Sequence, residues 1–206
     1  MFFVTADEAV GAALLPRRPF ADFCTDVRFP REGQQGRRYS RRMRMIPLHV
    51  RRVDSPLGRI EVGSDGESIV SLFIESGGAL PHDHLPAGDL DVLERAALQL
   101  AEYFAGERRR FDLPIVLQGT PFQLEIWSEL QRVDWGEITS YGALGQATGR
   151  LRSGRPIGGA VGANPIPIIV GCHRVLAGDG RITGFSAGEG IATKAWLLDH
   201  EGIAHR

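Results

Sequence analysis

The sequence has few cysteines and no long hydrophobic run. Its 206 residues include two cysteines, Cys24 and Cys172, too few for the disulfide framework of a small secreted domain. No run of about eighteen apolar residues is present, so no membrane-spanning helix is predicted. The first residues also lack the basic start and apolar stretch of a signal peptide. These absences favour a protein of the reducing cytoplasm, and a hydrophobic content of 43% suffices for a packed core.

The net charge of −1 hides an uneven distribution along the chain. Eleven arginines stand against three acidic residues between Arg17 and Arg52, whereas the rest of the chain is acidic. Within that acidic remainder, the stretch from Tyr141 to Arg181 holds five arginines against Asp179 alone. Local positive charge of this kind suits a small surface that binds a polyanion. Uneven scatter by chance is the alternative interpretation.

Three segments are predicted along the chain. Residues 1–45 carry several prolines and arginines without a lasting apolar period, so we expect a poorly ordered basic extension. This extension is either an arm that adds DNA affinity or a stretch that precedes the true start at Met43 or Met45. Residues 46–114 are predicted to form a small amino-terminal domain, and residues 115–206 a second domain.

The first domain is predicted to be α+β. The segments LHVRRV and RIEVGS flank a turn at residues 55–58, and the segment SIVSLFIE follows the turn Asp65-Gly66, which together predict three antiparallel strands. A helix through about Phe104 is predicted next, with Asp89 as its cap and Leu90, Leu93, Ala97 and Leu100 on its buried face. Between sheet and helix, His82 and His84 have no cysteine pair nearby, so no metal site is expected.

The second domain is predicted to be mostly helical and similar to a winged helix. Thr120 can cap a helix with Pro121 at its first position, and Ser140 can cap a short helix that stops at Gly149. A third short helix is expected from near Ser153 to before Asn164, which makes a helix-turn-helix. The apolar run at residues 165–170 is predicted to be a short strand that leads to Cys172, and a last helix closes the chain.

Cys172 is the strongest candidate for a nucleophile because His173 and Arg174 follow it directly. A thiol reacts as its thiolate, and nearby positive charge or a histidine base makes the thiolate more accessible. A Cys-His pair alone is a weak signal, since most lone cysteines are small buried hydrophobic residues.

The surrounding motif is more specific. The stretch NPIPIIVGCHRV, residues 164–175, resembles the active-site signature of the O6-alkylguanine-DNA alkyltransferases. Other segments follow in the order and near the spacing of that family: GTPFQ from Gly119, Trp127, Gly136-Glu137, SYG from Ser140, Arg155, Ser186, WLL from Trp196 and HEG from His200. The resemblance is good from about Pro114 to Gly202, plausible but poor in motifs from Ile46 to Leu113, and absent before Ile46.

The resemblance implies a DNA repair protein that acts once and needs no cofactor. It implies that Cys172 accepts a methyl or other alkyl group from O6 of guanine, that His173 takes the thiol proton through a water molecule, and that Glu201 orients His173. Asn164 would hold the active-site turn. The partner would be double-stranded DNA, with O4-alkylthymine left open as a second substrate, and the protein would act as a monomer.

The same resemblance implies how the damaged base is reached. The target atom lies inside a base pair, so the nucleotide must be turned out of the helix, in this family from the minor groove. Tyr141, with Gly142 beside it, would press on the neighbouring phosphate, and Arg155 would occupy the vacated place. Ser186 and the backbone amides after it would donate to O6.

The sequence departs from the family pattern at two positions and leaves two other functions open. Gly171 replaces the usual proline, which removes a fixed φ, and Phe185 stands where many members have tyrosine. Pro156 is acceptable only in the first turn of its helix. A non-catalytic sensor of alkylated DNA is one alternative, although such relatives lack the cysteine. A cysteine hydrolase with Cys172, His173 and Glu201 is the other, although its partners usually come from distant segments.

Overall fold

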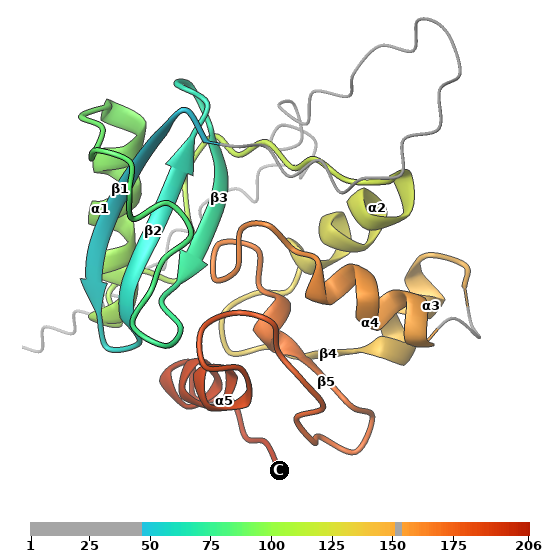
Figure 1. Cartoon of the computed structure of the whole chain (residues 1–206). Helices are drawn as coiled ribbons and strands as arrows, with labels where there is room; N and C mark the ends of the chain where they lie inside the picture. Colours follow the sequence, from blue (N-terminus) through green and yellow to red (C-terminus); the bar gives the residue numbers. More distant parts are fainter. Residues whose placement is uncertain (1–46, 151–153) are drawn as a thin grey trace, which may run out of the picture.

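The computed structural model describes residues 47–150 and 154–206. The predicted basic extension at residues 1–45, Cys24 and the predicted helix start at Ser153 lie outside the described residues. Figure 1 shows the elements in chain order: β1 (His49–Ser55), β2 (Gly58–Ser64), β3 (Ile69–Ile74), α1 (Asp91–Phe104), α2 (Pro121–Leu130), β4 (Thr139–Ser140), α3 (Tyr141–Ala147), α4 (Gly154–Gly162), the 3₁₀-helix η2 (Cys172–Arg174), β5 (Val175–Leu176) and α5 (Ile191–His200).

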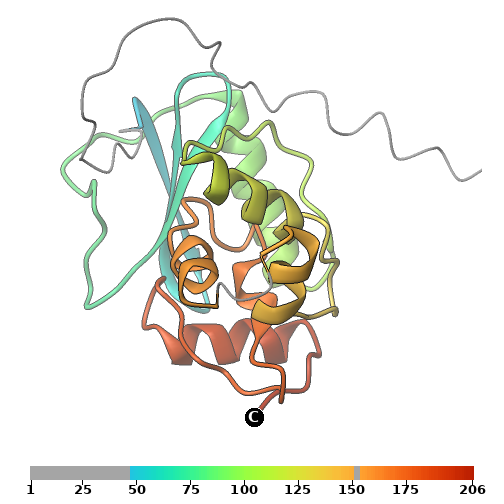
Figure 2. The ribbon, with the colours of Figure 1, turned by 90° about the vertical axis from the view of Figure 1, so that its right-hand side faces the viewer.

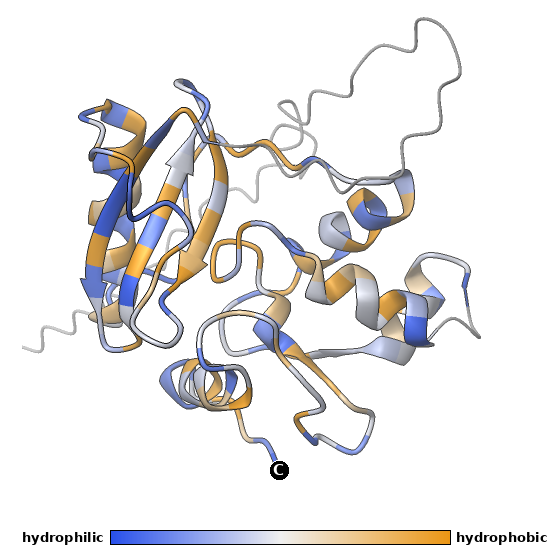
Figure 3. Cartoon of the chain, in the orientation of Figure 1, coloured by the Kyte–Doolittle hydropathy of each residue, from blue (hydrophilic) through white to orange (hydrophobic). Residues whose placement is uncertain are grey.

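The first three strands form an antiparallel sheet in the order β1-β2-β3. The β1–β2 turn ends at Gly58, whose φ of 90° a residue with a side chain rarely adopts. Helix α1 packs against β1 and β2, and β3 is coloured mostly hydrophobic in Figure 3. The structure therefore confirms the predicted α+β class with a three-stranded sheet, one helix and a mostly helical second part.

The predicted cap of α1 is wrong. Leu90 is the N-cap residue and makes no side-chain hydrogen bond, because the helix begins at Asp91 and Asp89 stands one residue too early to reach the first amides. Asp91 and Glu94 instead place negative charge in the first turn, which favours the helix dipole. The buried face uses Ala96 and not Ala97, which is only partly buried.

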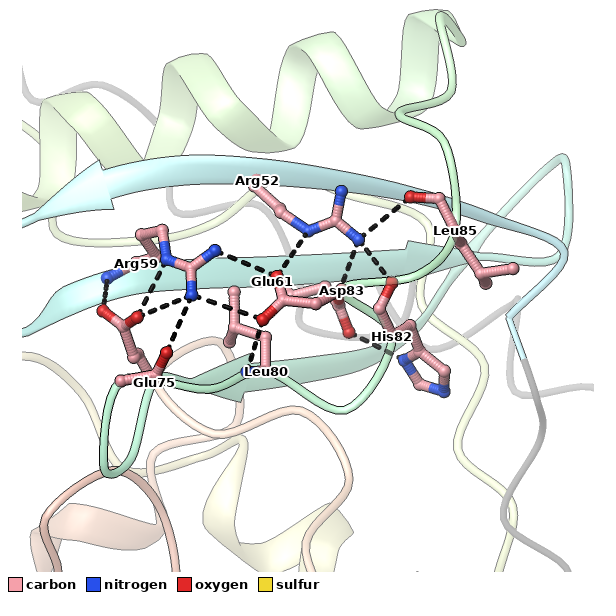
Figure 4. A network of polar contacts seen from close by, with 9 residues as sticks. Arg52, Arg59, Glu61, Glu75, Leu80, His82, Asp83 and Leu85 are labelled. Atoms are coloured by element: carbon pink, nitrogen blue, oxygen red, sulfur yellow. Dashed lines mark hydrogen bonds and ion pairs between the residues drawn. The ribbon is translucent and has the colours of Figure 1, made fainter.

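The loop between β3 and α1 is held on the sheet by a polar network (Figure 4). Glu61 of β2 is fully buried and contacts Arg52 and His82, with 2.7 Å between its Oε1 and His82 Nδ1. Arg52 Nη2 also donates to the carbonyls of His82 and Leu85, at 2.5 and 3.1 Å. A buried carboxylate is stable only with such partners. Because the partners of Glu61 and Arg52 include residues of the loop between β3 and α1, the network fixes this loop on the sheet. Among the described residues, no group of three or more potential ligand side chains could hold a metal ion.

The second part begins with two helices whose caps are confirmed. The Thr120 hydroxyl accepts from the Gln123 amide while the Gln123 side chain accepts from the Thr120 amide, which is a capping box, and Pro121 is the first helical residue of α2. Ser140 caps α3 by accepting from the Ala143 amide at 3.1 Å. Helix α4 packs against α2 and α3, so α3 and α4 form the predicted helix-turn-helix. Pro156 lies in the first turn of α4, where it removes no helical hydrogen bond.

The predicted strand at residues 165–170 is wrong. This apolar run forms turns and one isolated bridge between Pro167 and Val170. Pro165 and Pro167 have no amide hydrogen to donate to a ladder, and Ile168 has a φ of 74°, outside the strand region. The run is buried as a strand would be, but it reverses the chain.

One hydrophobic core passes through both parts of the molecule. It joins residues of the sheet and α1, such as Leu72 and Leu100, to residues of α2, α4 and the turn before Cys172, such as Trp127 and Ile166. Figures 1 and 2 show α5 across the end of the molecule beside β5. None of the helices in the described ranges is both long enough and apolar enough to span a bilayer.

Candidate active site

Cys172 is the first residue of η2 and lies at the end of the buried turn. Gly171 has φ −69° and ψ 54°, and the Cys172 amide donates to the Val170 carbonyl at 2.7 Å, which together define an inverse γ-turn. The thiol residue is only 4% exposed. This tight turn fixes the direction of the sulfur by backbone geometry.

Asn164 holds the turn from the other end. Its side-chain Nδ2 donates to the Val170 carbonyl at 2.8 Å, and its Oδ1 accepts from the Ile166 amide at 3.0 Å. The Asn164 side chain also hydrogen-bonds Cys172, which favours the thiolate. The predicted role of Asn164 in holding the turn agrees with these bonds, because it links both ends of residues 164–172.

Opposing effects act on the Cys172 thiol. Burial raises its pKa, while the Asn164 hydrogen bond and the charge of Lys194 lower it, and the net pKa stays above the ordinary 9.0. Lys194 of α5 is itself 1% exposed and donates its Nζ to the carbonyls of Val175 and Gly184, at 2.6 and 3.3 Å. The thiol is therefore protonated near neutral pH and requires a base. The burial of Lys194 was not predicted, because nothing in the neighbouring sequence distinguishes a buried lysine in a helix from an exposed one.

His173 is a suitable base. It is fully buried, and burial lowers its pKa below 6.5 despite its contact with Glu201, so the imidazole is neutral near pH 7. Its Nε2 lies 2.8 Å from Glu201 Oε1, which places the ring proton on Nε2. No protein group among the described residues hydrogen-bonds its Nδ1, so that nitrogen keeps its lone pair for a proton.

Glu201 stands at the end of α5, 4% exposed, and collects hydrogen bonds from three residues. His173 and the Tyr103 hydroxyl contact Oε1, each at 2.8 Å. Arg174 adds a two-pronged contact, with Nε on Oε2 and Nη2 on Oε1 at 2.8 Å, and donates Nη1 to the Val133 carbonyl. Burial raises the pKa of Glu201, but the bonds from His173 and Arg174 outweigh it, so its pKa lies well below 4.5. Glu201 is therefore ionised near neutral pH.

A cavity of about 490 Å³ opens over the sulfur. It lies between the start of α3, helix α4 and the loop after β5. Its lining residues are Tyr141, Gly154, Arg155, Gly158, Val161, Gly162, Cys172, Thr183, Gly184, Phe185 and Ser186. The nucleophile, the helix-turn-helix and the glycine-rich loop thus meet at one concave, largely apolar surface, which is typical of sites that bind small molecules.

The residues predicted to bind DNA are distributed around this cavity. Tyr141 and Arg155 line it, and no carboxylate of the described residues pairs with the exposed Arg155 guanidinium. Gly142 is exposed beside Tyr141 but does not line the cavity. The Ser186 hydroxyl donates to the Gly162 carbonyl at 2.7 Å, so its proton is already engaged. Thr183 donates to the Tyr141 hydroxyl at 3.2 Å across the cavity wall.

The two departures from the family pattern have different consequences. The φ of Gly171 is one that proline adopts, so the backbone has the same course without the ring. A Cβ at this position would meet Arg174 Nη1 at 2.9 Å, so the glycine also makes room for the guanidinium. Phe185 lines the cavity as the expected aromatic residue but brings no hydroxyl.

The comparisons with known proteins agree with this geometry. The family model described as "6-O-methylguanine DNA methyltransferase, ribonuclease-like domain" matches residues 48–117, and the model of the DNA binding domain of that family matches residues 121–203.

Similar whole proteins and structures carry related names. A methylated-DNA–protein-cysteine methyltransferase of Haemophilus influenzae is 39% identical over 163 residues, 78% of this chain and 90% of the relative. A constitutive enzyme of the same name from Bacillus subtilis is 36% identical, with 74% and 94% covered. The crystal structure of Mycobacterium tuberculosis OGT in complex with DNA has a TM-score of 0.67 at 37% identity, covering 75% of this chain and 92% of that one. The chain therefore belongs to the 6-O-methylguanine DNA methyltransferase family.

Proposed function

We propose that this protein repairs DNA by moving the alkyl group of O6-alkylguanine onto its own Cys172, once per molecule. The observation that carries the proposal is a buried cysteine that lines a cavity beside a helix-turn-helix and is followed by a neutral histidine hydrogen-bonded to a carboxylate. The relatives are methyltransferases of this kind by name. A free reactive thiol needs a reducing compartment, so the cytoplasm is the proposed place of action.

The transfer is a direct displacement at carbon. The Cys172 thiol gives its proton to Nδ1 of His173, directly or through one water molecule, and the sulfur lone pair attacks the alkyl carbon. The bond between that carbon and O6 breaks, and its electron pair stays on the guanine, which takes a proton from water and remains in the DNA as an ordinary base. Glu201 stabilises the imidazolium that forms. The product is an S-alkylcysteine, and nothing in the site can remove the group.

The surroundings of the cavity support duplex DNA as the substrate. The relative from Mycobacterium tuberculosis was crystallised with DNA, and in this chain the exposed Arg155 of α4 has no carboxylate partner among residues 47–150 and 154–206. Glycines at positions 154, 158, 159 and 162 keep α4 narrow, so this helix can approach a sugar-phosphate backbone closely. The proposed roles are that Tyr141 displaces the phosphate and Arg155 takes the place of the base that has turned out. Each copy holds a complete site, so we propose a monomer.

The direct test is the intact mass of the protein after incubation with a duplex oligonucleotide that contains one O6-methylguanine. We expect a gain of one methyl group, located on the Cys172 peptide, and no gain in Cys172→Ser. A folded protein that stays unmodified while the DNA keeps its methyl group would refute alkyl transfer. Tight binding to the modified duplex without transfer would favour the sensor function.

A second substrate separates the chemistry from the DNA steps. The free base O6-benzylguanine has no phosphate and no partner base, so it reports on Cys172, His173 and Glu201 alone. We expect Tyr141→Ala and Arg155→Ala to slow transfer from duplex DNA strongly and from the free base much less. Equal losses on both substrates would contradict the proposed roles of these two residues. Turnover of an amide or thioester would favour the hydrolase.

A further inference from the structure

The carboxylate of the relay has a hydrogen-bond partner in the other half of the molecule. Tyr103 lies in the last turn of α1, within the segment matched by the amino-terminal family model, 98 residues before Glu201. It is fully buried, and its hydroxyl donates to Glu201 Oε1 at 2.8 Å. This is the same oxygen that contacts His173 Nε2.

The hydroxyl is not explained by packing. The Tyr103 ring sits in an aromatic cluster with Phe104, Phe111, Trp135 and His200, with ring centroids 5.2 to 5.5 Å away. A phenylalanine would fill this cluster equally well, and a buried hydroxyl is unfavourable unless it is bonded. Burial and the charge of Glu201 raise the pKa of Tyr103, so the phenol stays protonated and remains a donor.

The donors are unevenly divided between the two carboxylate oxygens. An ionised carboxylate offers about four lone-pair directions, two on each oxygen. In this site three donors, His173 Nε2, Arg174 Nη2 and the Tyr103 hydroxyl, bind Oε1, whereas Arg174 Nε alone binds Oε2. Arg174 already holds both oxygens in a plane, so the tyrosine is not needed to orient the group. Tyr103 instead affects how strongly Oε1 attracts the ring proton of His173. Donors on one acceptor atom compete for its negative charge, so the Tyr103 hydrogen bond weakens this attraction.

We propose that Tyr103 is a positioning residue that tunes the relay from the amino-terminal half of the protein, by drawing charge from Glu201 Oε1 and so keeping His173 neutral and ready to accept the thiol proton. This role rests on alkyl transfer by Cys172. The other charged and titratable groups that face the relay are Arg174 of η2, Lys194 of α5 and Cys172 itself, and His200 of α5 packs edge to face against the Tyr103 ring. None of them changes in the test below.

The test is the pH dependence of single-turnover transfer from O6-benzylguanine. The acid limb of the profile reports the protonation of His173, which then cannot take the thiol proton. In Tyr103→Phe, Oε1 has one donor fewer and binds the imidazolium more strongly, so we expect the acid limb to move to higher pH by about half to one unit. Site-specific 3-fluorotyrosine at position 103 keeps the shape and is a stronger donor, so the limb should move to lower pH.

The matched control is Gln99→Met on the same helix. Gln99 is buried and exchanges two hydrogen bonds with the Asp112 backbone, so its loss destabilises α1 without touching the relay. We expect a lower melting temperature in this variant and an unchanged acid limb. An acid limb that stays at the wild-type pH in the fluorotyrosine protein, or in folded Tyr103→Phe, overturns the proposal and leaves Tyr103 a packing residue. If the wild-type protein does not accept the benzyl group, the same pH profiles are measured with the O6-methylguanine duplex. A wild-type protein that leaves this duplex unmodified refutes the proposed function instead.

Discussion

Replacement of Glu201 by glutamine tests the role of its negative charge, because glutamine has nearly the same size and shape but is neutral. The side chain is buried with Arg174, so solvent does not screen the pair. Loss of the negative charge leaves the Arg174 guanidinium uncompensated and presents an amide donor where Arg174, Tyr103 and His173 all donate. Removal of one partner of a buried pair typically costs about 3 to 5 kcal/mol.

The magnitude of the loss sets the conditions of the experiment. A domain of this size is stable by about 5 to 15 kcal/mol, so Glu201→Gln should remain folded in the cold. Its melting temperature should fall by roughly 6 to 20 °C. The transfer rate should fall by at least about 100-fold, the usual contribution of a positioned acid–base group, because the imidazolium of His173 loses its counter-charge.

The assay is single-turnover transfer at low temperature, with circular dichroism as the check on folding. The matched control is Leu130→Ala, a fully buried residue of α2 whose truncation costs about 2 to 5 kcal/mol but leaves the relay untouched. We expect a similar melting temperature for the two variants and near wild-type transfer only for Leu130→Ala. If folded Glu201→Gln transfers as fast as Leu130→Ala, Glu201 does not act through His173.

Three further outcomes follow from the same geometry. Gly171→Pro should keep the transfer rate within about twofold, because φ is already −69°. It should not raise the melting temperature, because the added ring meets the Arg174 guanidinium, which is held by Glu201. A large loss of transfer in the single-turnover assay would mean that Arg174 cannot move away from the added ring. Lys194→Met removes the cation that favours the thiolate, so transfer from both DNA and free base should slow by about tenfold or more, and equal rates would exclude an electrostatic role. The urea midpoint should fall as the pH drops below 6.5, because the folded pKa of His173 is lowered and the unfolded chain takes up the proton first. Below pH 4.5, Glu201 takes up a proton in the unfolded chain but not in the folded protein, which adds to the loss of stability. A His173→Gln protein should lack the first of these two steps.

Much of the fold follows from chemistry that is local in the sequence. The hairpin needs only alternating apolar residues around a turn that ends at Gly58, and the starts of α2 and α3 need only Thr120 and Ser140 a few residues from the amides they bind. Each of these signals depends on residues no more than four positions apart, so it can be recognised in a single sequence. The strand expected at residues 165–170 shows the limit, because an apolar run indicates burial but not direction, and the two prolines in it favour a reversal.

In the candidate site, too, residues of one local motif were predicted, whereas residues brought in by tertiary packing were not. Cys172, His173 and Asn164 lie within ten residues and were predicted from one motif, whose resemblance to a family also implied Glu201. The structure brings these four residues together. Tyr103 and Lys194 were missed because each is an ordinary member of an amphipathic helix, and only tertiary packing turns one hydroxyl toward Glu201 and buries one amine beside Val175.

The family models divide the chain near residue 118, but the active site does not respect that division. The Leu72 amide of β3 donates to the Pro165 carbonyl at 2.9 Å, so the edge of the sheet holds the turn that carries Cys172. Gly188, in the loop beside the cavity, lies so close to β3 that a Cβ at this position would be 3.0 Å from Ile74. In the same loop, Glu189 accepts a hydrogen bond from the Gly77 amide at 2.8 Å. The turn that carries Cys172, the loop beside the cavity and Glu201 therefore all have contacts with the amino-terminal half. Residues 121–203 alone would hold the same side chains of the candidate site without these contacts.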